Sequence, residues 1–344
     1  MSRNSQRIVS PIQWLLLYSN GVRSFDIDRS DNLAVYWGQG SSAKQQPLAK
    51  YCQDDVIDII PISFLTTFSG TGGLPVIDIS TQCSGSTFPG TGLLDCSTLA
   101  ADIKACQSKG KILVLSMGGG DGSDAQVSFS SDSDAQKFGD ILWNTFLGGT
   151  SKTRPFGDAV IDGIDFDIEH GNSPHYGALI KQLRSHMNGA NKKYYITAAP
   201  QCAYPDKNIG PALNAGDFDA VFVQFYNNPE CGIGTSVFNY DTWHKWATQM
   251  SPNRNVKVYL GLAASRSAAG SGYMDATALS KLLIQLQDYS SFGGAMMWDA
   301  SEAYSNSRYD QQIKKILIPN GAGWDCGGNP DQVPLSASHT KSVA

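Results

Sequence analysis

The sequence predicts an α/β fold, a (β/α)₈ TIM barrel in which eight parallel strands alternate with helices. One observation is that eight short apolar or β-branched runs recur along the chain. A second is that most of these runs are separated by stretches long enough for a helix. Active sites of such barrels lie at the C-terminal ends of the strands, so the residues at those ends are the first candidates for function.

The expected strands and helices follow one another along the chain. The candidate strands are short β-branched or apolar runs, at 33–37, 57–64, 112–117, 163–169, 195–199, 220–226, 256–262 and 294–298. The candidate helices lie between strands, at 98–109, 133–143, 175–188, 240–249 and 275–289. The stretch between the last two strands has room for one helix and little else. We therefore expect no insertion domain before the last strand.

The composition is typical of a globular protein. With 344 residues, 41% hydrophobic content and a net charge of −5, the chain can bury a large core within one domain. The mild acidity and the lack of a basic run argue against a nucleic-acid partner. No stretch reaches about 18 consecutive apolar residues, so no transmembrane helix is expected. We also expect a monomer that needs no cofactor.

Three segments are expected along the chain: an N-terminal segment at 1–28, the barrel at 29–319 and a C-terminal tail or linker at 320–344. Within the first segment, residues 12–18 (IQWLLLY) follow two arginines and resemble a weak secretory signal. Pro11 precedes this short stretch and Gln13 interrupts it, so the sequence leaves a signal peptide open. The tail shows no periodic apolar pattern.

Cysteine usage favours an oxidising compartment. The chain has seven cysteines, and Cys83 and Cys96 bracket a loop rich in Gly, Ser, Thr and Pro that a disulfide would tie. No CxxC motif occurs, which argues against zinc ribbons and thioredoxin chemistry. Buried free thiols that pack as small hydrophobes remain the alternative.

The stretch 162–170 (DGIDFDIEH) interleaves acidic and apolar residues with the period of a β-strand. Its alternation sorts six side chains into two rows: Ile164, Phe166 and Ile168 on one side, Asp165, Asp167 and Glu169 on the other. The preceding residues are also apolar, which indicates that the outer face of the strand is covered. Three carboxylates therefore converge on one enclosed surface. Asp162 has the wrong parity to join them, and we expect it to support the start of the strand.

Carboxylates packed on one face repel each other when ionised, so at least one is expected to hold a proton near neutral pH. Such a group can act as the general acid of glycoside hydrolysis. An aspartate cluster also suits calcium or magnesium, and spacing alone leaves that alternative open. The five histidines form no HExxH and no GxSxG occurs, which argues against zinc-protease and serine-nucleophile chemistry.

Polar and aromatic residues cluster at the predicted strand ends. They form the segments YWGQ at 36–39, SMGG at 116–119, DIE at 167–169, PQ at 200–201, QFYN at 224–227 and MWD at 297–299. A single tryptophan, such as Trp37 or Trp298, is more often part of the core than a ligand platform. Their common position at the strand ends nevertheless indicates a binding surface.

The spacing Asp162-x-x-Asp165-x-Asp167-x-Glu169 resembles the DxxDxDxE signature of glycoside hydrolase family 18, specifically the class III chitinases of the plant and fungal type. The resemblance runs from about 33 to 318, and we expect a fungal source. Five further segments carry it: YWGQ at 36, LSMGGG at 115, AAPQC at 198, QFYNNP at 224 and MMW at 296. The resemblance implies a secreted protein; association with a cell wall stays open.

The resemblance implies a substrate-assisted, retaining mechanism, in which the 2-acetamido oxygen of the sugar attacks the anomeric carbon. Glu169 would protonate the glycosidic oxygen and then activate water. Asp167 would accept a hydrogen bond from the acetamido N–H, and Asp165 would share a proton with Asp167. Tyr226 would hold the acetamido oxygen, and Trp298 would form the floor under that sugar. The remaining expected substrate-binding residues are Tyr36, Gln224, Gln201, Asn227 and Gly119.

The function that the resemblance implies is an endo-acting chitinase, with polymers and oligomers of β-1,4-linked N-acetylglucosamine as its partners and no metal. One alternative is a sugar-binding or inhibitor protein on the same barrel, although such relatives typically lose the acid. Another is the same fold acting on N-linked glycans or peptidoglycan. The resemblance also implies three disulfides, with Cys326 left over: Cys52–Cys106, Cys83–Cys96 and Cys202–Cys231.

Overall fold

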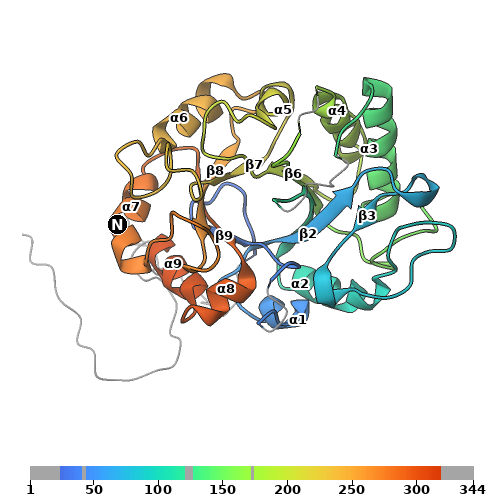
Figure 1. Cartoon of the computed structure of the whole chain (residues 1–344), viewed down its shortest axis with the longest axis horizontal. Helices are drawn as coiled ribbons and strands as arrows, with labels where there is room; N and C mark the ends of the chain where they lie inside the picture. Colours follow the sequence, from blue (N-terminus) through green and yellow to red (C-terminus); the bar gives the residue numbers. More distant parts are fainter. Residues whose placement is uncertain (1–23, 41–43, 121–126, 172–173, 319–344) are drawn as a thin grey trace, which may run out of the picture.

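The computed structural model describes residues 24–40, 44–120, 127–171 and 174–318. Eight parallel strands close into a barrel, in the order β1-β9-β8-β7-β6-β5-β4-β2 with β1 pairing back to β2. The short β3 is added antiparallel to β2 outside the barrel. Figure 1 shows the helices arranged around the strands. The predicted (β/α)₈ fold is confirmed.

The strands are β1 (Asn32–Val35), β2 (Ile59–Thr67), β3 (Val76–Ile77), β4 (Ile112–Gly118), β5 (Gly163–Asp167), β6 (Tyr195–Ala198), β7 (Ala220–Gln224), β8 (Lys257–Ala263) and β9 (Phe292–Trp298). The helices are α1 (Leu48–Cys52), α2 (Ala100–Ser108), α3 (Asp132–Phe146), α4 (Tyr176–Met187), α5 (Gly210–Ala215), α6 (Tyr240–Lys245), α7 (Ala276–Leu286), α8 (Ala300–Ser305) and α9 (Tyr309–Leu317). Each of the eight predicted strands overlaps a barrel strand. Helix α7 is the only helix between β8 and β9 in this described stretch, as expected.

Four helices and one strand were not predicted: α1, α5, α8, α9 and β3. Three of these helices have only five or six residues, too short to show a helical period. Strand β5 ends at Asp167, two residues earlier than predicted, so Glu169 follows the strand. No helix in the described part of the chain is long and apolar enough to cross a membrane.

The alternation of β5 divides its side chains between the helix layer and the barrel interior. Phe166 is fully buried and packs edge-on against Tyr176 of α4 and against Phe218, with ring centroids 5.9 and 5.7 Å apart. Asp165 is also fully buried, but its partners lie inside the barrel: Ser116 on the neighbouring β4 and Tyr36 directly after β1. The predicted parity is therefore confirmed for Asp165 and Phe166, whereas Glu169 lies beyond the end of β5.

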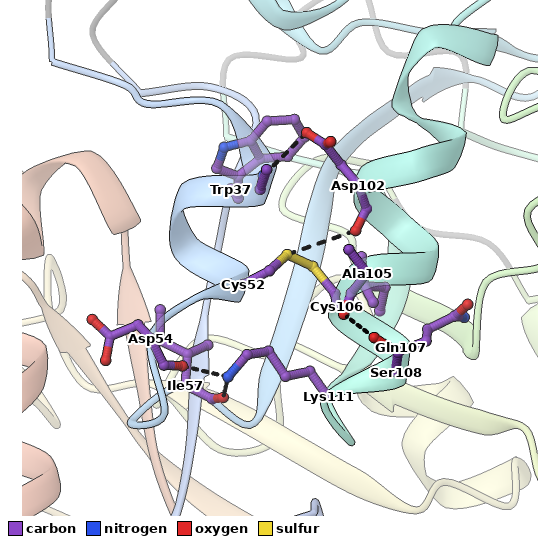
Figure 2. The surroundings of a disulfide bond; sticks show 12 residues. Trp37, Cys52, Asp54, Ile57, Asp102, Ala105, Cys106, Gln107, Ser108 and Lys111 are labelled. Atoms are coloured by element: carbon purple, nitrogen blue, oxygen red, sulfur yellow. Dashed lines mark hydrogen bonds between the residues drawn. A yellow bond between two sulfur atoms is a disulfide. The ribbon is translucent and has the colours of Figure 1, made fainter. Parts of the chain in front are cut away.

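The structure forms the three disulfides that the resemblance implied: Cys52–Cys106, Cys83–Cys96 and Cys202–Cys231. The free-thiol alternative is wrong for these six cysteines. Figure 2 shows that Cys52–Cys106 joins α1 to α2, close to Lys111 at the start of β4. Cys326, the expected tail and most of the N-terminal segment lie outside the described residues.

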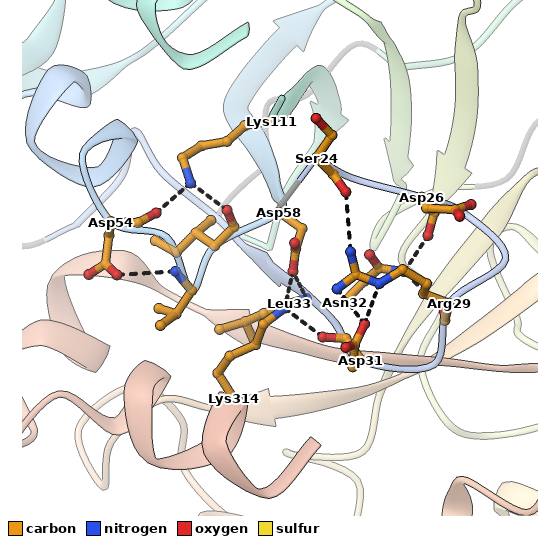
Figure 3. A network of polar contacts seen from close by, with 12 residues as sticks. Ser24, Asp26, Arg29, Asp31, Asn32, Leu33, Asp54, Asp58, Lys111 and Lys314 are labelled. Atoms are coloured by element: carbon orange, nitrogen blue, oxygen red, sulfur yellow. Dashed lines mark hydrogen bonds and ion pairs between the residues drawn. The ribbon is translucent and has the colours of Figure 1, made fainter. Parts of the chain in front are cut away.

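The N-terminal ends of the strands carry a network of charges. Asp58 accepts the backbone N–H of Leu33 at 2.7 Å and pairs with Lys314 of α9, and both charged side chains are almost fully buried. Lys314 also donates to the Asp31 carbonyl at 2.6 Å. Lys111 donates to the carbonyl oxygens of Asp54 and Ile57. Figure 3 shows the contacts of Lys314 with Asp58 and Asp31 and, beside them, those of Lys111.

Candidate active site

A cavity of about 530 Å³ opens at the C-terminal ends of the barrel strands. Eight of the predicted site residues line it: Tyr36, Gly119, Asp167, Glu169, Gln224, Tyr226, Asn227 and Trp298. Two others, Asp165 and Gln201, are not part of its lining. They contact residues that do line it, Tyr36 and Glu169 respectively. The residues predicted from their positions at the strand ends therefore lie in or directly beside this cavity.

Asp165 is a fully buried carboxyl group surrounded by hydroxyl donors. Its Oδ2 accepts hydrogen bonds from Tyr36 and Ser116 at 2.7 Å each, and its Oδ1 accepts one from Thr197 at 2.6 Å. Burial raises the pKa of Asp165, whereas the three hydroxyl donors oppose that rise. The surroundings of Asp165 thus offer the ionised carboxylate good hydrogen-bond partners.

Asp167 and Glu169 are neighbouring carboxyl groups that interact electrostatically and share the Gln224 amide as a donor. Burial, followed by the charges of Glu169 and Asp165, raises the pKa of Asp167 well above its usual range. Burial also raises the pKa of Glu169, and Asp206 adds to that rise. Repulsion from Glu169 and Asp165 therefore acts on Asp167 as expected, whereas the interaction with Asp167 lowers the pKa of Glu169; burial is the largest cause for both groups. The pair is therefore suited to hold a proton near neutral pH.

Three amide side chains hold Glu169. Gln201 Nε2 donates to Oε2 at 3.1 Å, and Gln224 Nε2 lies 3.4 Å from Oε1 while donating to Asp167 at 3.0 Å. Asn208 Nδ2 donates to the Glu169 backbone carbonyl at 2.7 Å. In this structure Gln201 and Gln224 thus bind the acidic residues themselves. Asn208 was missed, because its loop carries no pattern that relates it to β5.

Aromatic rings form the walls beside the carboxyl pair. Trp298 is partly exposed to the cavity and stacks on Phe64, with centroids 5.7 Å apart and an interplanar angle of 16°. Tyr226 lines the cavity, and none of the described residues hydrogen-bonds its hydroxyl. Burial raises the pKa of Tyr226 well above its usual range, so the hydroxyl stays protonated and can donate.

Gly119 and Asn227 shape the loops around the cavity. Gly119 has φ +98°, donates its N–H to the Asp167 carbonyl at 2.8 Å, and leaves no room for a Cβ beside the Phe64 ring. The Oδ1 of Asn227 accepts the N–H groups of Gly270 and Ser271 at 2.8 and 3.3 Å. Both residues therefore organise backbone near the site.

Further cavity residues were missed beyond the predicted end of β2. Thr66, Thr67 and Asp78 line the cavity because β2 continues to Thr67 and β3 returns beside it. Gln39, which belongs to a predicted strand-end segment, also lines it and donates to the Asp78 carbonyl at 2.7 Å. The position of Thr66, Thr67 and Asp78 at the cavity follows from the length of β2, which was not evident from the sequence.

The alternative of a cation site fits the geometry poorly. The carboxylate oxygens of Asp165, Asp167 and Glu169 face O–H and N–H donors, which a metal ion would have to displace. Within the described residues, no group of three or more His, Cys, Asp or Glu side chains is arranged to hold a metal ion. The arrangement instead suits proton transfer beside a sugar-sized cavity.

Comparison with known proteins gives concordant results. Residues 32–275 match the glycosyl hydrolases family 18. An endochitinase of Saccharomyces cerevisiae is 45% identical over 307 residues, which cover 89% of this chain and 52% of that protein. The crystal structure of a chitinase from Ipomoea carnea has 36% identity and a TM-score of 0.72, covering 83% of this chain and 99% of that chain.

A xylanase and α-amylase inhibitor protein from Scadoxus multiflorus is also similar, with 38% identity and a TM-score of 0.69 over 82% of this chain and 97% of that chain. The chain spans between 52% and 62% of the length of the first three fungal chitinases that it matches. The family match covers more than half of the chain and includes the carboxyl cluster and Tyr226. The chain therefore belongs to family 18 of the glycosyl hydrolases.

Proposed function

We propose that the chain is an endo-acting chitinase, which hydrolyses β-1,4 linkages of N-acetylglucosamine polymers with retention of configuration. The observation that carries this proposal is the proton-holding pair of Asp167 and Glu169 in the same cavity as Tyr226 and Trp298. This combination supplies an acid, a hydrogen-bond donor for an amide oxygen and an aromatic surface for a sugar ring.

Each residue has a part in the proposed reaction. Glu169 donates its proton to the glycosidic oxygen while the sugar's acetamido oxygen attacks the anomeric carbon. Asp167 accepts the acetamido N–H and stabilises the positive charge of the oxazolinium ring, supported by the buried charge of Asp165. Tyr226 donates to the acetamido oxygen, and Trp298 lies beneath the sugar. Glu169 then takes a proton from the water that opens the ring.

The substrate class follows from this chemistry. A sugar without a 2-acetamido group lacks the nucleophile, so cellulose oligomers should not react. With α7 alone between β8 and β9, no described insertion covers the cavity, which favours attack within a polymer. The similar yeast protein is named an endochitinase, which supports the same reading.

The similarity to an inhibitor protein supports a second candidate, a barrel that binds a partner without catalysis. The retained Glu169, with its amide donors and raised pKa, favours the enzyme.

We further propose that the protein acts outside the cell as a monomer, in contact with cell-wall chitin, since three disulfides suit an oxidising compartment. Size-exclusion chromatography with light scattering tests the monomer.

The experiment that tests the proposal is digestion of N-acetylchitohexaose, with cellohexaose, an N-glycosylated protein and peptidoglycan in parallel. We expect internal cleavage of the chitin oligomer alone, with β-anomeric products in early NMR spectra. Release of single units from one end would contradict endo action. Cleavage of the glycoprotein or peptidoglycan instead would reassign the substrate, and binding without turnover would favour the non-catalytic barrel.

A further inference from the structure

Asp206 is a buried carboxyl group that the proposed reaction does not use. It lies in the loop between β6 and α5 and is 3% exposed. Its Oδ2 accepts the N–H of Gln201 at 2.8 Å, and its Oδ1 accepts those of Asn208 and Ile209 at 2.7 Å each. Across the described ranges it has no ion pair with Lys, Arg or His. Both of its oxygens are thus committed to backbone donors of this loop.

Two other residues of this loop contact Glu169, the proposed acid. The side chain of Gln201 donates to Glu169 Oε2, and the side chain of Asn208 donates to the Glu169 backbone carbonyl. Asp206 therefore fixes the backbone of the two residues of its loop that touch Glu169. An exposed turn could have the same side-chain to backbone hydrogen bonds without any relation to catalysis. Here, however, the residues whose backbone Asp206 binds, Gln201 and Asn208, contact Glu169 through their side chains.

Charge adds a second connection. The titratable groups that act on Glu169 come from three elements: Asp167 of β5, His170 directly after Glu169, and Asp206 from the loop. The charge of Glu169 also raises the pKa of Tyr226, which lies two residues beyond the end of β7. Asp206 opposes ionisation of Glu169, whereas protonated His170 favours it. Burial raises the pKa of Asp206 too, while its backbone donors oppose that rise.

We propose that Asp206 is a positioning residue for the acid: it fixes the backbone of Gln201 and Asn208, whose side chains contact Glu169. This inference rests on the proposed function in so far as Glu169 is the acid. It predicts that Asp206 contributes to the pH range of activity, which a residue that merely caps a turn would not do.

The sharpest test is a direct titration of Glu169. The chain has three glutamates, Glu169, Glu230 and Glu302. Carboxyl ¹³C labelling of glutamate therefore gives three NMR signals, which single Glu→Gln variants assign. In Asp206→Asn we expect the Glu169 signal to titrate at lower pH than in the wild type, while the signals of Glu230 and Glu302 stay in place. An unmoved Glu169 signal would overturn the proposal.

Activity gives a second readout on a fluorogenic N-acetylchitooligosaccharide. Asp206→Asn should move the alkaline limb of the kcat/KM profile to lower pH, with roughly a tenfold loss on that side of the optimum. Asn208→Ala is the matched control, because it removes a contact to Glu169 and keeps the Asp206 charge. It should lower kcat at every pH without moving the limb. Coincident limbs in the wild type and Asp206→Asn would contradict the proposal.

The two proposals can fail separately. A wild type that turns over no chitin oligomer contradicts the proposed function, whereas the NMR titration still decides the role of Asp206. Circular dichroism and thermal unfolding establish that Asp206→Asn is folded. If it is not, Asp206→Ser takes its place, because it removes the charge and keeps an oxygen acceptor for the turn.

Discussion

Buried acids lie at both ends of the barrel, but they have different partners. At the N-terminal ends of the strands, three aspartates each accept a backbone N–H from the preceding barrel strand and pair with a cation: Asp58 with Lys314, Asp162 with Lys192 and Asp219 with Arg184. At the C-terminal ends, four acids have only hydroxyl, amide, backbone or carboxyl partners within the described residues: Asp165, Asp167, Glu169 and Asp206.

The difference shows how one residue type serves structure at one end and chemistry at the other. A carboxylate that pairs with a lysine or arginine and accepts a backbone N–H ties neighbouring elements of the barrel together. A buried carboxyl group beside neutral donors and other acids has a raised pKa and can hold a proton. These four acids lie at the end of the barrel with the cavity, so proton transfer is available where a sugar can bind.

The largest expected effect on stability comes from breaking a pair at the N-terminal end. Asp58→Asn leaves the buried Lys314 charge without its partner, so we expect a loss of about 3–5 kcal/mol in the free energy of unfolding. Denaturant unfolding at neutral pH measures it. Asp167→Asn should cost far less stability while removing activity. A small effect of Asp58→Asn would break the comparison, and Asp58→Asn combined with Lys314→Met should recover part of the loss.

Two of the disulfides lie at opposite ends of the barrel: Cys52–Cys106 near the N-terminal ends of the strands and Cys202–Cys231 near the cavity. Removing Cys52–Cys106, beside Lys111, with two Cys→Ser changes should cost about 2–4 kcal/mol of stability and leave kcat of the folded enzyme unchanged. Removing Cys202–Cys231 should lower kcat even where the protein stays folded, because Cys202 adjoins Gln201. Thermal unfolding and single-substrate kinetics on both variants decide it. Equal kcat in the two variants would contradict this division.

Tyr226→Phe tests the donor at the cavity end. Loss of a hydrogen bond to a group that becomes charged costs about 1.5–3 kcal/mol, so kcat should fall roughly 10- to 100-fold with little change in melting temperature. Tyr240→Phe is the control, since this buried hydroxyl donates to the Val258 carbonyl away from the cavity. It should leave kcat unchanged. An unaltered rate in Tyr226→Phe would exclude the acetamido contact.

A last effect concerns the pH dependence of stability. Burial lowers the pKa of Lys111 from 10.5 to about 8, so the unfolded chain binds a proton that the folded chain has lost between these values. Stability from this residue therefore rises with pH across that window. The stability difference between wild type and Lys111→Met, measured by urea unfolding, should grow in favour of the wild type from about pH 8 to about pH 10. A constant difference would contradict the lowered pKa.

Alternation and strand-end position carried most of what the sequence could predict. Parity separated Asp165, Asp167 and Glu169 from the apolar row, and it correctly left Asp162 at the entrance of β5, where it accepts the N–H of Leu113. These features depend on local geometry, which a short stretch of sequence contains.

The rest depends on loops and on neighbours distant in sequence. A strand-end position places Gln201 near the site, but whether its amide faces substrate or Glu169 depends on how the following loop folds back. Asp206 and Asn208 reach Glu169 through that loop, across more than thirty positions of sequence. The extension of β2 to Thr67 depends on its pairing with β3 and β4, which a loop-like composition hides.

The most direct test of the central claim is hydrolysis of a fluorogenic N-acetylchitooligosaccharide by the wild type and Glu169→Gln, with a fluorogenic cello-oligosaccharide as the control substrate. Glu230→Gln, the same change on an exposed side chain, is the control variant. We predict turnover of the acetylated substrate by the wild type and Glu230→Gln, and a loss of several orders of magnitude in Glu169→Gln with binding retained. Substantial turnover by Glu169→Gln, or cleavage of the cello-oligosaccharide, would contradict the account.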